Sequence, residues 1–83
     1  MVRPTTDAIQ RLITENYIQV DDLGRYIPKA AAQDLADELM QKFSGISCAI
    51  VPDRRYGMLF HVQSSKTRRT FFKMQIRDSY HDE

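Results

Sequence analysis

The sequence predicts an α+β domain in which two or three N-terminal helices pack on a three-stranded antiparallel sheet. Its 83 residues, 42% of them hydrophobic, suffice for one domain with one core. Apolar residues recur at helical spacing as far as Phe43, and from Ile46 onward they alternate with a period of two. We therefore expect a single domain over 1–83, with frayed ends at 1–4 and 78–83.

The first helix is expected directly after Pro4, with Thr5 or Thr6 as its N-cap. Its apolar positions follow helical spacing: Ile9, Leu12, Ile13 and Tyr17. The next segment, 18–27, is ambiguous, because its apolar spacing suits a short helix while 21–24 could also close a small hairpin. We favour the short helix.

The strongest predicted element is a helix over 28–43. Pro28 suits the first helical position, and Ser44 and Gly45 end the element. One continuous apolar face consists of Ala32, Leu35, Ala36, Leu39, Met40 and Phe43.

Three strands are predicted over 46–51, 58–63 and 67–77, with turn residues between them. In the last strand, one face carries Phe72, Met74 and Ile76. The opposite, outward face carries Arg69, Phe71, Lys73, Gln75 and Arg77. We expect an antiparallel meander whose apolar face packs on the helices, with its third strand available as a pairing edge.

Charge is divided unevenly along the chain. Residues 1–49 hold five basic and seven acidic side chains, net −2, whereas 50–83 hold seven basic and four acidic, net +3. No Asp or Glu lies between Arg54 and Arg77. Basic groups interleaved with aromatic rings are typical of nucleic-acid-binding surfaces. Two alternatives stay open: cations that protect a sheet edge from aggregation, and a surface for an acidic protein.

Residues 6–62 resemble a winged helix-turn-helix domain. In this resemblance, 9–27 corresponds to the first helix, a short strand and the second helix, 28–43 to the third helix, and 46–62 to the wing. The resemblance implies DNA binding, with the third helix in the major groove and the wing on the backbone. It assigns Lys29, Ala30 and Gln33 to the groove, and Arg54, Arg55 and Tyr56 to phosphates.

The sequence offers little for catalysis or metal binding. Cys48 is the only thiol, and His61 and His81 are the only histidines, so four zinc ligands of the Cys/His type are not available. We expect no enzymatic activity, no cofactor and no metal. There is no apolar run near the roughly 18 residues that cross a bilayer, and no signal peptide, which predicts a cytoplasmic protein without membrane contact.

The favoured function is a non-enzymatic module that binds nucleic acid, DNA rather than RNA, through a basic hairpin turn and a strand face. The expected binding residues are Lys29, Gln33, Arg54, Arg55, Tyr56, Lys66, Arg68, Arg69, Phe71, Lys73 and Arg77. The alternative is an adaptor-like regulator or inhibitor that binds an acidic protein surface, acting through the sheet edge or as a homodimer.

Overall fold

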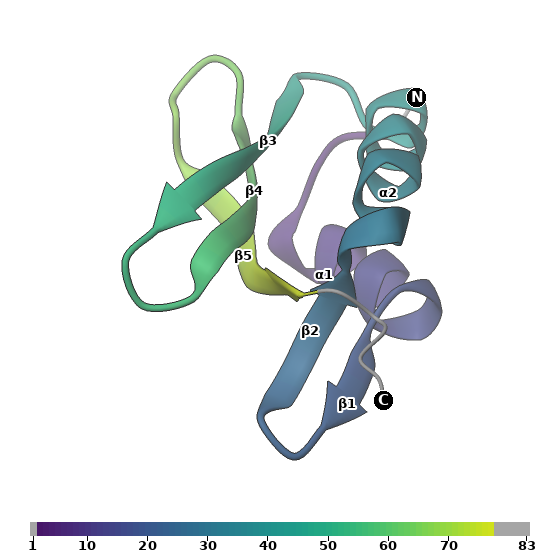
Figure 1. Cartoon of the computed structure of the whole chain (residues 1–83). Coiled ribbons are helices and arrows are strands. Elements are labelled where there is room, and N and C mark those ends of the chain that lie inside the picture. The colour runs from purple at the N-terminus through teal and green to yellow at the C-terminus, as the bar shows by residue number, and fades with distance from the viewer. Residues whose placement is uncertain (1, 78–83) are drawn as a thin grey trace.

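The computed structural model describes residues 2–77 and shows an α+β fold, with two helices and a five-stranded mixed sheet in that part of the chain (Figure 1). In chain order the elements are α1 (Thr6–Asn16), β1 (Gln19–Asp21), β2 (Gly24–Pro28), α2 (Lys29–Lys42), β3 (Ile46–Asp53), β4 (Gly57–Ser64) and β5 (Thr70–Arg77). The strand order is β1-β2-β5-β4-β3, and all neighbours are antiparallel except β2 and β5. The α+β class is confirmed, but the predicted three-stranded sheet is part of a larger mixed one.

Helix α1 begins as the sequence predicts. Thr5 is its N-cap, and the Thr5 Oγ1 accepts the Ala8 N–H at 3.1 Å. This bond satisfies one of the free amides that every helix start exposes. Ile9 and Ile13 are fully buried, so the apolar stripe of α1 faces the core.

Residues 18–27 form a hairpin, and the favoured short helix is wrong. The Asp21 carboxylate accepts the Leu23 N–H at 2.8 Å, which fixes the turn between β1 and β2. Gly24 follows at φ +108°, a conformation that glycine adopts without steric strain. As a strand, the segment places Ile27 in the core. The second helix implied by the winged-helix resemblance is therefore replaced by a strand here.

Helix α2 matches the long predicted helix, although Pro28 is its N-cap residue rather than its first residue. Because Pro28 also ends β2, no turn separates that strand from the helix. Leu35 and Leu39 are fully buried, whereas Met40 at the flank of the apolar face is 42% exposed.

The three predicted C-terminal strands form the meander β3–β4–β5. Phe60 and Val62 are buried on its inner face, as the alternation predicts. The pairing of β4 with β5 shifts register between Val62 and Gln63, so the alternation does not continue through Phe71. Phe71 packs against the core, which corrects its predicted place on the outward face. The predicted pairing edge is also wrong, because β5 lies between β2 and β4.

Both helices pack on the same side of the sheet, α1 against β5 and α2 against β2, β3 and β5 (Figure 1). The core between the layers includes Ile9, Ile13, Ile27, Leu35, Leu39, Phe60, Val62 and Ile76. The other side of the meander carries the residues that alternate with these, among them the paired His61 and Lys73, and is called the outward face below.

The start of the chain is held by the end of α2. Val2 forms a parallel bridge with Phe43, and its N–H donates to the Lys42 carbonyl at 2.8 Å. The predicted acidic tail 78–83 lies outside the described residues.

Candidate nucleic-acid interface

The turn between β3 and β4 presents Arg54, Arg55 and Tyr56 on an ordered backbone. The Asp53 carboxylate oxygen Oδ2 accepts the N–H groups of Arg55 and Tyr56, both at 2.9 Å. The Arg55 guanidinium lies 5.6 Å from the centre of the Tyr56 ring. All three side chains are exposed. The Asp53 carboxylate thus orders the turn through backbone amides.

The loop between β4 and β5 is built in the same way. The Ser64 Oγ accepts the N–H groups of Lys66 and Thr67 at 3.2 and 3.1 Å, and the Ser64 carbonyl accepts the Arg68 N–H at 3.0 Å. The Thr67 Oγ1 accepts the Arg69 N–H at 3.2 Å. Arg68 has a φ of 67°, a conformation that costs a non-glycine residue free energy. Its backbone is fixed, and its side chain is exposed.

Between these loops, the outward face offers polar and basic groups. Lys73 is exposed and pairs across the sheet with His61. The His61 Nε2 lies 2.8 Å from the Thr70 Oγ1, within hydrogen-bonding distance. Among the described aromatic residues, only Tyr56 is exposed, with 48% of its surface accessible. The face therefore provides hydrogen-bonding groups and a cation, with one exposed ring at its end, and it also carries the apolar pair Val51 and Leu59.

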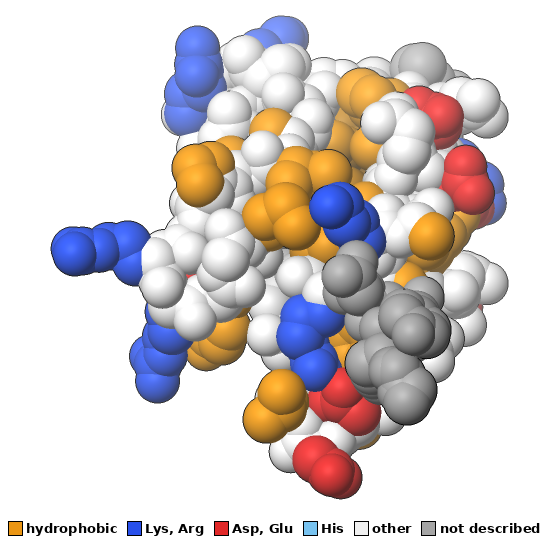
Figure 2. Space-filling model, in the orientation of Figure 1, with side chains coloured by type: hydrophobic (Ala, Val, Ile, Leu, Met, Phe, Trp, Pro, Cys, Tyr) orange, Lys and Arg blue, Asp and Glu red, His pale blue; other side chains and the backbone are white. Residues whose placement is uncertain are grey.

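The two loops lie at opposite ends of β4. This strand has eight residues, each paired with β3, from Gly57 opposite Asp53 to Ser64 opposite Ile46. Seven steps of extended chain separate the loops by about 23 Å. Figure 2 shows Lys and Arg side chains around the ends of the meander, and further ones in the middle of the view and beside the Asp and Glu side chains, which appear over the β1–β2 turn and on the side of α2.

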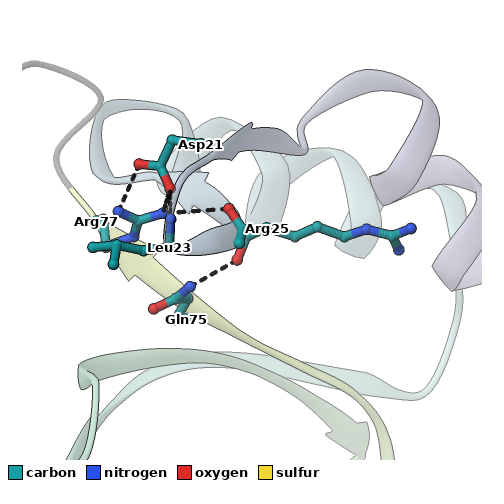
Figure 3. A network of polar contacts seen from close by, with 6 residues as sticks. Asp21, Leu23, Arg25, Gln75 and Arg77 are labelled. Carbon is teal, nitrogen blue, oxygen red and sulfur yellow. Dashed lines mark hydrogen bonds and ion pairs between the residues drawn. The ribbon is translucent and has the colours of Figure 1, made fainter.

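Arg77 is engaged inside the molecule (Figure 3). Its guanidinium donates to both carboxylate oxygens of Asp21, at 2.7 and 2.6 Å, and lies 4.1 Å from the centre of the Tyr26 ring. The hydrogen bond to Asp21 is the main cause that raises the pKa of Arg77. The structure therefore places Arg77 in a structural contact between β5 and the β1–β2 hairpin.

Lys29 and Gln33 lie apart from the meander loops. Both are exposed on α2, in the helical layer, on the other side of the sheet from Lys73. The Gln33 Nε2 donates to Asp37 Oδ1 at 3.1 Å. The structure thus does not bring the residues that the resemblance assigned to a groove together with the loops.

The loop cations have no carboxylate partner within residues 2–77. The ion pairs in this part of the chain are Lys42 with Glu38, at 3.2 Å, and Arg77 with Asp21, at 2.6 Å. The unpaired basic residues of the meander are Arg54, Arg55, Lys66, Arg68, Arg69 and Lys73. These six residues are called the loop cations below.

A shallow hollow of about 440 Å³ adjoins the β3–β4 turn. Besides Tyr56 and Lys73, its lining includes Leu23, Arg25 and Gln75. Leu23 is 76% exposed. The sequence placed Gln75 on the outward face but gave no indication of Leu23 or Arg25, because the hairpin that carries them reaches this place only through its pairing with β5.

Within the described residues, no three of His, Cys, Asp and Glu gather to form a metal site. Cys48 is half-buried, and burial raises the pKa of its thiol to about 11. Neither described helix is long and apolar enough to span a bilayer. No family model, curated protein or solved structure matches the chain.

Proposed function

We propose that this chain is a non-enzymatic nucleic-acid-binding module that contacts the phosphates of DNA, in preference to RNA, through the loop cations. The observation that carries the proposal is that these six side chains, on the two ordered loops and on strand β5, have no carboxylate partner in the described chain. Unpaired cations release the counterions condensed on a nucleic acid when they bind it, which favours association.

The placement of the loop cations also bears on the alternative that they protect a sheet edge. Lys and Arg that block aggregation belong on the edge strands themselves. The edge strands here are β1 and β3, and neither contains Lys or Arg. The cations lie instead on the loops at the two ends of β4 and on the central strand β5. This arrangement favours a ligand-binding role.

The test is a titration of a fluorescent DNA duplex at several salt concentrations. For the native protein, log K should fall linearly with log salt, by about 0.9 per phosphate contact. The variant Arg54→Ala/Arg55→Ala should bind more weakly, with a slope smaller by one to about two. The control Arg3→Ala/Arg11→Ala removes the same charge from exposed positions outside the meander and should change the slope little. Affinity no tighter than millimolar at low salt would overturn the proposal.

A second candidate function is binding of a protein strand or a second copy at β3. A small groove of about 190 Å³ runs between this edge strand and α2, and its lining includes Met40 and Ile50, which are 42% and 49% exposed. An edge strand without Lys or Arg, beside exposed apolar side chains, is suited to β-pairing. Sedimentation of the native chain and of Ile50→Lys tests this candidate. A concentration-independent monomer would count against self-association.

A further inference from the structure

We infer that the meander binds double-stranded DNA by contacting two separate stretches of phosphate backbone at once, one through the Arg54–Arg55 turn and the other through the Arg68–Arg69 loop. The inference rests on the proposed function and adds the class of nucleic acid. Both loops carry a pair of adjacent exposed arginines on a backbone fixed by side-chain acceptors, Asp53 in one and Ser64 in the other.

The spacing of the two arginine pairs suits a duplex. They lie at the two ends of the eight-residue strand β4. The resulting separation of about 23 Å exceeds the roughly 12 Å width of a major groove, which leaves room for the backbone on each rim. A duplex is stiff over this length, so contact with one loop holds the second backbone stretch near the other loop. A flexible single strand would lose conformational freedom to reach both.

The outward face between the loops does not favour single strands. Proteins that bind single strands without sequence preference stack successive bases on aromatic rings. Here Phe60 is buried, and Phe71 packs against the core. Tyr56, at one end of the face, is the exposed aromatic residue of the described chain. The outward face presents polar groups and Lys73 between two loops that carry arginines. Such a face suits the phosphate surface of a duplex better than the unstacked bases of a single strand.

The experiment measures the affinity of three labelled probes: a duplex of about 20 base pairs, a hairpin with a stem of about five base pairs, and the single strand of the longer probe. The short stem spans about 17 Å, at 3.4 Å per base pair, and so reaches one arginine pair at a time. We expect the long duplex to bind at least about tenfold more tightly than either other probe, because its second contact is intramolecular.

Variants separate two-loop binding from a general effect of charge. Arg54→Ala/Arg55→Ala and Arg68→Ala/Arg69→Ala should each weaken binding of the long duplex about tenfold or more, because each removes one of two linked contacts. For the short stem, each double variant should lower the affinity only about twofold, because the other arginine pair still binds. Arg3→Ala/Arg11→Ala is the control of equal charge. Thermal unfolding of each variant verifies that the substitutions leave the fold intact.

The outcomes are distinguishable. Equal affinity for the single strand and the long duplex, or equal losses on the short and long probes, would overturn this inference and leave the proposed function standing. Failure of the native protein to bind any of the three probes at low salt would overturn both.

Discussion

At the scale of single residues, Arg68 shows a conflict between stability and the proposed binding role. Its φ of 67° lies in the left-handed region, where a side chain costs about 1 kcal/mol or more. A glycine would remove this strain, yet the position presents an exposed guanidinium beside Arg69. A strained backbone at an exposed cation is consistent with selection for binding rather than for stability.

Replacing Arg68 by glycine should therefore separate the two properties. We expect Arg68→Gly to raise the free energy of unfolding by about 0.5–1 kcal/mol, after part of the relieved strain is offset by the greater freedom of glycine in the unfolded chain. Duplex affinity should fall. Urea denaturation and duplex titration measure the two effects. Arg69→Gly, at a residue without positive φ, is the matched control and should lower stability. A loss of stability in both variants would contradict the strain argument.

Tyr17 and Glu38 form a second contact whose effect can be measured. The Tyr17 hydroxyl donates to Glu38 Oε1 at 2.6 Å, and Lys42 Nζ lies 3.2 Å from Glu38 Oε2. Hydrogen bonds from Tyr17 and then Lys42 lower the pKa of Glu38, and the bond to Glu38 raises the pKa of Tyr17 to about 12. The folded state thus favours the ionised carboxylate and the protonated phenol.

Both contacts make the stability of the fold depend on pH. Glu38 contributes to the free energy of unfolding at pH values above 4.5, its ordinary pKa. This contribution is lost as the pH falls through the lowered pKa that Glu38 has in the folded protein. The contribution of Tyr17 is present below pH 10 and is lost as the pH rises toward about 12. Tyr17→Phe should lower the free energy of unfolding by about 1 kcal/mol at neutral pH. The decrease of this free energy at acid pH should also become less steep, and urea denaturation at several pH values measures both effects. Tyr56→Phe, at an exposed ring, should leave the free energy of unfolding and its pH dependence unchanged.

At the scale of elements, the β1–β2 hairpin is paired with the meander by a short ladder. Its ladder with β5 consists of Ile27 opposite Ile76 and Pro28 opposite Arg77. Nearer the turn, the Gln75 side chain donates to the Arg25 carbonyl at 2.8 Å, and Arg77 holds Asp21 (Figure 3). Side-chain contacts thus hold the hairpin at the positions where β2 and β5 no longer pair through their backbones.

Removal of the Arg77 guanidinium should loosen this hairpin selectively. We expect Arg77→Met to raise hydrogen-exchange rates of the β1 and β2 amides about tenfold, with little change in β3 and β4. Nuclear magnetic resonance measures these rates amide by amide. Arg25→Met is the control, because the Arg25 guanidinium points away from Gln75 and Arg77 (Figure 3). Equal rates in both variants would show that the ladder alone holds the hairpin.

At the scale of the whole molecule, the distribution of charge matters more than its sum. The formal net charge is only +1. The loop cations lie on the meander, while Asp34 and Asp37 are exposed on α2 in the helical layer. A polyanion should therefore approach the molecule from one side and avoid the other.

This polarity predicts where duplex DNA perturbs amide resonances. Shifts should be concentrated at 53–56 and 64–70, because both loops belong to the proposed interface, and should be small along 33–41 of α2. A two-dimensional amide spectrum recorded during titration with duplex measures them. Shifts centred on Lys29 and Gln33 would contradict the proposed surface and favour the groove contact that the winged-helix resemblance implies.

The sequence by itself determined the elements whose signals are local. The N-cap at Thr5 or Thr6, the apolar face of α2 around Leu35 and Leu39, and the alternation through Phe60 and Val62 were predicted because they depend on nearby residues. It also located the acid-free run from Arg54 to Arg77, and the structure leaves six of its seven cations without a carboxylate partner in the described chain.

Tertiary structure alone decided which strands are neighbours. The central place of β5 and the inward position of Phe71 both depend on pairing between different strands. Arg77 shows the reason most directly, because Asp21 lies 56 residues away and no local pattern connects the two. Periodicity reports which face of an element is apolar, whereas the register and order of strands depend on the packing of the whole chain.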